Sequence, residues 1–309
     1  MQMDVLISQM EMFASLIVIG FLVQRIGLLS DENITNFSAV LSRFIIPSML
    51  VTVIAGGGTR GELLGSWKFL LCASAAVTVF IAFSFFVSNF MGFKQPRKNM
   101  NAIVMSYGNA GFIGIPLVTA LFPETGAIPA ALYLFVEAVA CWVFGPVFAA
   151  GGEKKKIELK GLVTPLTISI ALGVIMILLN IDLSGFVPWD TLEAIGGTTK
   201  YFACLYVGMD LGRKGFGSLL VDKRIFVSTP FKLIIFPIIG YLVFGKTGIL
   251  TGDNILILIL FLSTPTGMAV PILAEMGNGD RKYAIAGTLI NTLLCIVSIP
   301  AVMYIVSML

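Results

Sequence analysis

Long apolar stretches, separated by short polar segments, run from one end of the chain to the other. Most of them reach or exceed the roughly 20 residues that an α-helix needs to cross the hydrocarbon core of a bilayer. The pattern predicts ten membrane-spanning helices, at residues 5–24, 34–55, 67–90, 99–121, 127–149, 162–180, 191–211, 225–244, 253–275 and 283–307. We therefore expect an all-α membrane protein with almost no chain left for a soluble domain.

Composition strengthens this prediction. Of the 309 residues, 57% are hydrophobic and only 12% are charged, whereas soluble domains carry about 25% charged residues. Asp4 precedes the first apolar stretch and Glu11 lies within it, where a cleavable signal peptide would have a basic region, so we expect the stretch to remain as the first helix. The expected location is the cell membrane, with the lipid bilayer as the principal surroundings.

Basic residues concentrate in the loops that follow odd-numbered helices. On the opposite side only Arg60, Lys68 and Lys246 are found. Because basic loops stay in the cytoplasm, both termini are predicted to face outward. The net charge of +3 then reflects membrane topology and does not indicate nucleic-acid binding.

The chain carries signs of an internal repeat. The most basic loop, residues 151–161, separates a first set of five helices in residues 1–150 from a second set in residues 162–309. An odd number of helices per half means that the second half enters the membrane from the opposite side. A shift of 155 residues aligns Pro116 with Pro271 and Asn109 with Thr264. Inverted repeats with matching helix breaks are typical of secondary transporters.

Both aligned segments contain residues that interrupt helices. Glycines and a proline lie within residues 99–121, and prolines lie within residues 253–275. Freed backbone groups cost several kcal/mol each in hydrocarbon, so we expect broken helices 4 and 9 to cross beside a wet cavity. A small-residue packing face with a proline kink is the alternative. Candidate substrate-binding residues are Gly108, Asn109, Gly111, Pro116, Thr264, Pro265, Thr266 and Pro271.

If the two helices split, the second half of each begins where they cross. The N-terminal end of a helix presents free N–H groups and the positive end of its dipole. Such an arrangement suits an anion. The expected substrate is therefore a small organic anion.

Several ionisable residues fall inside predicted helices, where a charge costs about 2.5 kcal/mol or more. Glu137 is a candidate for coupling to H⁺ or Na⁺, or else a buried structural acid, and an offset of 154 aligns it with Asn291. Lys232 can snorkel to the cytoplasmic surface or face a cavity between Pro230 and Pro237. Arg43 suits an interfacial position, and Lys200 is a candidate for dianion selectivity.

The chain offers no constellation for catalysis or for a metal. It contains no histidine, which removes Ser-His-Asp chemistry, and the four cysteines lie in four different apolar stretches. Buried free cysteine commonly packs as a small hydrophobe. We expect a protein that is not an enzyme and that has no metal or cofactor apart from a coupling ion. These cysteines are Cys72, Cys141, Cys204 and Cys295.

Four segments, GNAGFIGIPLV, TPTGMAVPILAEMG, GFLVQRIGLLSDENI and RFIIPSML, make the chain resemble the auxin efflux carrier family. The resemblance is to a bacterial member related to plant PIN carriers and to malonate and malate permeases. It implies a scaffold of helices 1, 2, 6 and 7, a transport unit of helices 3–5 and 8–10, an elevator-type motion and a homodimer through the scaffold. It also places Asn109 at the substrate carboxylate.

The same resemblance leaves the substrate open among mono- and dicarboxylates such as malonate or malate and auxin-like acids. PIN carriers have an asparagine in the break of helix 9, where this chain has Thr264, which favours a smaller acid. Crossed broken helices also occur in sodium-coupled symporters of the bile-acid type and in cation/proton antiporters. An obligatory Na⁺ dependence that is lost on Glu137→Gln would favour the first of these alternatives.

Overall fold

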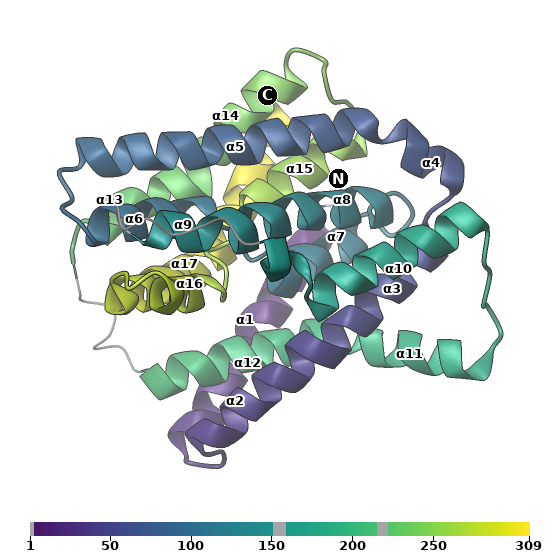
Figure 1. The fold of residues 1–309 in the computed structure, drawn as a ribbon, viewed down its shortest axis with the longest axis horizontal. Helices are drawn as coiled ribbons and strands as arrows, with labels where there is room; N and C mark the ends of the chain where they lie inside the picture. Colours follow the sequence, from purple (N-terminus) through teal and green to yellow (C-terminus); the bar gives the residue numbers. More distant parts are fainter. Residues whose placement is uncertain (1–2, 151–158, 215–221) are drawn as a thin grey trace. The chain divides into compact units, whose positions relative to one another are not determined.

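The computed structural model describes residues 3–150, 159–214 and 222–309, most of which lie in helices (Figure 1). The chain packs into two compact units. Unit 1 comprises Met1–Lys68, Gly111–Phe135 and Val163–Gly215, and unit 2 comprises Phe69–Ala110, Val136–Leu162 and Phe216–Leu309.

Helices occur at most of the positions that the apolar pattern predicts. Within the described residues, six helical stretches are long and apolar enough to span a bilayer, and three shorter apolar helices accompany them. Large apolar side chains such as Val18, Leu22, Phe90 and Val297 are exposed on these helices, as expected of surfaces that face lipid. The long stretches are Met3–Arg25 (α1), Asp31–Gly57 (α2, η1 and α3), Trp67–Phe90 (α5), Ala127–Ala149 (α8, η3 and α9), Ile225–Gly245 (α13, η6, α14 and η7) and Arg281–Met308 (α17).

Unit 1 is built on close helix packing. Helix α1 packs along α12 (Thr199–Lys214), and α3 (Ile46–Gly57) packs against α10 (Pro165–Leu179) and α11 (Val187–Gly197). Glycines allow the closest approaches: a side chain at Gly208 would collide with the carbonyl oxygen of Ile17, and one at Gly20 with that of Leu205. Small residues at helix interfaces are the usual means of close packing in membranes.

The prediction of a single helix over residues 191–211 is wrong. Helix α11 ends at Gly197 and α12 begins at Thr199. Two consecutive glycines, at 196 and 197, are weak helix formers. The hydroxyl of Thr198 donates to the Ile195 carbonyl at 2.6 Å, which satisfies a carbonyl at the end of α11.

Prolines explain a recurring irregularity in the long helices. Four π-helical segments each end two residues before a proline, which removes one N–H donor and displaces the carbonyl four residues earlier. The turn before the proline widens, and bonds such as that from the Gly145 amide to the Ala140 carbonyl span five residues. The segments are η1 (Leu41–Ile45), η2 (Ala110–Gly114), η3 (Ala140–Phe144) and η6 (Phe231–Ile235), followed by Pro47, Pro116, Pro146 and Pro237.

Several helices of unit 2 pack around α17. Helices α6 (Arg97–Ser106), α13 (Ile225–Pro230), α15 (Asp253–Leu262) and α16 (Val270–Met276) all contact it. Ion pairs between side chains join residues at one end of the unit: Arg97 pairs with Asp280 at 2.8 Å and with Asp222 at 3.1 Å. Arg224 pairs with the same Asp222 at 2.8 Å. Three segments that are distant in sequence are thereby joined.

The two units differ in one respect from the scaffold and transport partition that the family resemblance implies. Helices 1, 2, 6 and 7 of the sequence prediction lie in unit 1, but so do residues 111–135, which the resemblance assigns to the transport unit. Of the predicted basic loop, residues 151–158 lie outside the described residues, and Leu159–Leu162 (η4) forms a 3₁₀ turn.

Candidate functional site: the helix crossover

Two helices of unit 2 stop inside the protein and meet there. Helix α6 ends at Ser106, and the next helical segment, η2, begins at Ala110. Helix α15 ends at Leu262, and α16 begins at Val270. Between these ends Gly108 and Thr266 form an antiparallel bridge, and the Gly267 amide donates to the Tyr107 carbonyl at 3.1 Å. We call residues 107–109 and 263–269 the crossover.

Glycine is required where the two backbones meet. A side chain at Gly108 would lie 2.5 Å from Thr264 Oγ1 and 2.8 Å from Glu137 Oε1. At Gly267 it would collide with the carbonyl oxygen of Gly108. The chain can therefore cross this closely only because neither position carries a Cβ atom.

The Glu137 carboxylate hydrogen-bonds to the backbone at the first break, between α6 and η2. It is 7% exposed, and its Oε1 accepts a hydrogen bond from the Gly108 amide at 2.7 Å. The Ala110 amide also hydrogen-bonds to this carboxylate. A side chain of the protein therefore already occupies two amides at this break, and the binding of a substrate anion to the other N–H groups of the second helix half stays a prediction.

Asn291 hydrogen-bonds to a side chain at the second break, between α15 and α16. Its Nδ2 donates to Thr266 Oγ1 at 2.6 Å, and the Thr266 hydroxyl in turn donates to the Val104 carbonyl at 2.6 Å. The side-chain oxygen of Asn291 has no hydrogen-bond partner among the described residues. Glu137 and Asn291, which the shifted sequence aligns, thus each bind one of the two breaks.

Lys232 lies in the interior, which corrects the interpretation that it snorkels to the surface. Only 1% of the residue is exposed, and its Nζ lies 4.9 Å from the centre of the Phe80 ring. It is close enough to Glu137 for their charges to attract each other. Pro230 and Pro237 flank the π-helical segment η6 that carries it. A lysine side chain thus accompanies the buried carboxyl group.

The remaining residues predicted at the breaks are buried or half-buried. Asn109 is 3% exposed, and Thr264 and Pro265 are buried. The Thr264 hydroxyl donates to the Phe261 carbonyl at 2.6 Å. Pro271, in the first turn of α16, is half-buried. The crossover therefore brings buried polar side chains together, although the helices around it are apolar.

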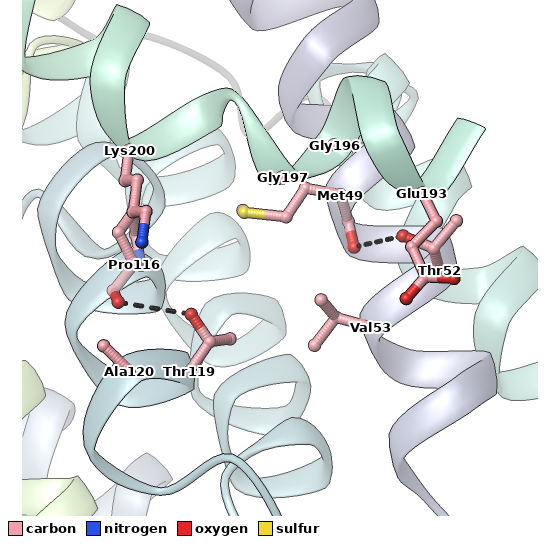
Figure 2. Close-up of a pocket in the computed structure, with 10 residues that line it drawn as sticks. All are labelled: Met49, Thr52, Val53, Pro116, Thr119, Ala120, Glu193, Gly196, Gly197 and Lys200. Carbon is pink, nitrogen blue, oxygen red and sulfur yellow. Dashed lines mark hydrogen bonds between the residues drawn. The ribbon is translucent and has the colours of Figure 1, made fainter. Parts of the chain in front are cut away.

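Other predicted residues lie in unit 1. Pro116 and Lys200 line a cavity of about 270 Å³, which we call the unit 1 cavity (Figure 2). Gly111 has open surroundings, because the nearest atom to a Cβ placed there would be 4.0 Å away, and Arg43 is exposed in η1. Glu193, which also lines the cavity, was not predicted as a site residue although it lies inside the predicted helix 191–211, two residues from its start.

The four cysteines are free and buried, in agreement with the prediction that they pack as small hydrophobes. Each of them belongs to a different helical stretch of the sequence.

Comparisons with known proteins agree with these observations. A family model described as membrane transport protein matches residues 6–158 and 153–303. A protein of Rhizobium meliloti (strain 1021), provisionally named a malonate transporter, is 24% identical over 310 residues, which cover 95% of this chain and 93% of the relative. An uncharacterised transporter of Methanothermobacter thermautotrophicus is 20% identical over 292 residues, covering 92% and 93%. The chain belongs to this membrane transport family, the auxin efflux carriers.

Proposed function

We propose that the protein is a secondary carrier that moves a small organic anion across the cell membrane by alternating access. The observation that carries the proposal is the bridge between Gly108 and Thr266, which joins two interrupted helices inside an apolar helical unit. Interrupted helices at membrane depth are tolerated where they line a substrate pathway. The proposal includes ten spans in two inverted five-helix repeats.

The proposed motion is of the elevator type. Unit 2 contains the whole crossover and is the unit that would carry substrate, while unit 1 would act as the scaffold. Support comes from the division of the chain itself, since the segments of each unit are discontinuous in sequence but compact in space. A homodimer through unit 1 helices belongs to the same proposal, and native mass spectrometry in detergent would test it.

The proposed substrate is a carboxylate, either a mono- or dicarboxylate such as malonate or malate or an auxin-like acid. An anion buried in the membrane needs hydrogen bonds and must not face a net negative charge. The Asn109 side chain offers an amide that can donate to a carboxylate, and the charge of Glu137 is offset by Lys232. One relative carries the name of a malonate transporter.

We propose that a proton, and not Na⁺, is the coupling ion. Lys232 already supplies a positive charge near Glu137, so a metal ion is not needed to neutralise the carboxylate. Protonation of Glu137 would weaken its hold on the Gly108 amide, which could then donate to a substrate carboxylate. One carboxylate would replace the other at the first break.

Flux through proteoliposomes tests the substrate site. The protein would be reconstituted and assayed with radiolabelled malonate, malate and monocarboxylates. We expect saturable uptake that falls at least tenfold in Asn109→Ala, because a hydrogen bond to a charged group contributes about 1.5–3 kcal/mol. Asn254→Ala, which changes an exposed asparagine of α15, is the matched control. Equal uptake by the two variants would contradict the crossover as the substrate site.

A second flux experiment tests the coupling ion. Glu137→Gln keeps an oxygen that can accept from the Gly108 amide but removes the titrating group. We expect wild-type uptake to follow an imposed pH gradient and to be unchanged when Na⁺ is replaced by K⁺, and we expect the variant to ignore the pH gradient. An absolute requirement for Na⁺ would instead favour a sodium-coupled symporter.

A further inference from the structure

The unit 1 cavity shares no lining residue with the crossover and has a distinct chemistry. Four helices line it: α3, α7 (Ile115–Leu121), α11 and α12. Its volume of about 270 Å³ is close to the lower end of the roughly 300–1,000 Å³ range that is typical of ligand pockets. The cavity therefore suits a small metabolite.

Two opposite charges face this cavity without pairing. Figure 2 shows Lys200 and Glu193 on opposite sides of it, with Met49 between them. Ion pairs within 4 Å found among the described residues do not include either side chain. The Lys200 ammonium lies 5.0 Å from the Tyr201 ring centre. Lys200 can therefore bind a carboxylate, and Glu193 disfavours a second negative charge on the far side.

The two threonines of the cavity offer only acceptors. The Thr52 hydroxyl donates to the Ser48 carbonyl at 2.9 Å, and the Thr119 hydroxyl donates to the Ile115 carbonyl at 3.0 Å. Because each hydroxyl has one proton, the lone pairs that remain can only accept a hydrogen bond from a ligand. A ligand hydroxyl or ammonium fits this environment, and a second carboxylate does not.

We infer that the unit 1 cavity binds a small monocarboxylate that carries a hydrogen-bond donor, namely a hydroxy acid or an amino acid. Lys200 holds the carboxylate. The donor group meets the oxygen atoms of Thr52, Thr119 and Glu193. The inference rests on the proposed function only in taking carboxylates as the ligand class, and it makes Lys200 a residue that determines specificity.

Gly197 offers a variant that fills the cavity without disturbing the fold. It lines the cavity, and nothing lies within 4 Å of the position that its Cβ would take. Gly197→Leu should therefore occupy the ligand space. Gly196 next to it would collide with the Met49 backbone and is unsuitable. Lys200→Met removes the charge at similar length, and Lys200→Arg retains it.

Isothermal titration of the purified full chain tests the inference. The probes are lactate, glycolate, alanine and serine, compared with acetate, malonate and succinate. We expect hydroxy or amino monocarboxylates to bind in preference to the others, with Kd raised about tenfold or more in Lys200→Met and Gly197→Leu and nearly restored in Lys200→Arg. Glu193→Gln should improve malonate binding. The hydroxy-acid and amino-acid arms identify which donor the cavity prefers.

Other outcomes overturn the inference. These are failure of every donor-bearing probe to bind, preference for dicarboxylates in the wild type, or unchanged affinity in Lys200→Met or Gly197→Leu. Asn109→Ala separates this test from that of the crossover. Binding that is lost in Asn109→Ala but kept in Lys200→Met would refute the cavity site and leave the proposed carrier function intact. Binding that is kept in Asn109→Ala, together with unchanged flux in that variant, would support the cavity site and contradict the crossover as the substrate site.

Discussion

At the scale of residues, the crossover is a set of buried polar groups that satisfy one another. Glu137 accepts from the Gly108 amide, while Asn291 donates to Thr266. The positions could be predicted from the sequence, because glycine and proline mark the breaks and a polar residue inside an apolar span is conspicuous. The direction of each hydrogen bond could not, since it depends on which backbone group the fold brings within reach.

Gly108→Ala should disrupt the crossover. The added methyl group would lie within 3 Å of Glu137 Oε1 and Thr264 Oγ1, and forcing such contacts typically costs about 1–3 kcal/mol. We expect a lower melting temperature in detergent and loss of uptake. Gly111→Ala is the control for stability, because its nearest neighbour is the Leu166 side chain at 4.0 Å. Equal melting temperatures would show that the backbones are farther apart than described.

Thr266 and Asn291 should be energetically coupled. Thr266→Val removes the hydroxyl that accepts from Asn291, and Asn291→Leu removes the donor. Contacting residues usually show interaction energies of about 0.5–3 kcal/mol. The loss of unfolding free energy in the double variant should therefore be smaller than the sum of the losses in the two single variants. Denaturation of all four proteins under identical conditions measures this difference. Simple additivity would mean that the hydrogen bond is absent.

At the scale of elements, four of the five π-helical segments in the part of the chain that the structure describes precede a proline, and η7 (Tyr241–Gly245) does not. Pro47, Pro116, Pro146 and Pro237 each follow a π-helical segment. Proline positions are visible in the sequence, so the interruptions near them could be predicted. The interruption at Thr198 could not be predicted, because its only sequence signal is a glycine pair. The final turn of α11 also depends on the hydrogen bond that the Thr198 hydroxyl donates to the carbonyl of Ile195, three residues earlier.

The contact between α1 and α12 should depend on glycine. A methyl group at Gly208 would collide with the Ile17 carbonyl, so Gly208→Ala must push the helices apart or fail to fold. We expect a clear fall in melting temperature. Gly56→Ala, in α3, has nothing within 4 Å and should be tolerated. Similar stability of the two variants would argue against the close packing of α1 on α12.

The ion cluster at one end of unit 2 predicts a dependence on pH. The hydrogen bond from Arg224 lowers the pKa of Asp222 to about 2, below the usual value of about 3.9. The folded protein therefore binds fewer protons there than the unfolded chain. The stabilisation is complete above about pH 4 and is lost as the pH falls towards 2.

Melting curves of the wild type and Asp222→Asn between pH 6 and pH 3 measure this effect. We expect the wild type to be more stable at pH 6 and the difference to shrink as the pH falls. Asp190→Asn, which changes an exposed carboxylate of α11, should show no such trend. A difference that grows in acid would contradict the role of the Asp222 ion pairs.

At the scale of the whole molecule, the apolar pattern was enough to predict a helical membrane protein and the positions of most helices. The division into units was less predictable. Residues 111–135 belong with unit 1 although they follow directly on the first break. Unit membership depends on which surfaces pack together, and an apolar helix carries little information about its partner because all of its faces resemble one another.

The most direct test of the central claim is an experimental density map of the protein with a transported carboxylate bound. The claim is that two interrupted helices meet at Gly108 and Thr266 and that the substrate binds there. We predict a break in each helix, contact between these two residues, and ligand density within hydrogen-bonding distance of Asn109. Helices that continue through both positions, or a carboxylate bound only away from Asn109, would contradict the claim.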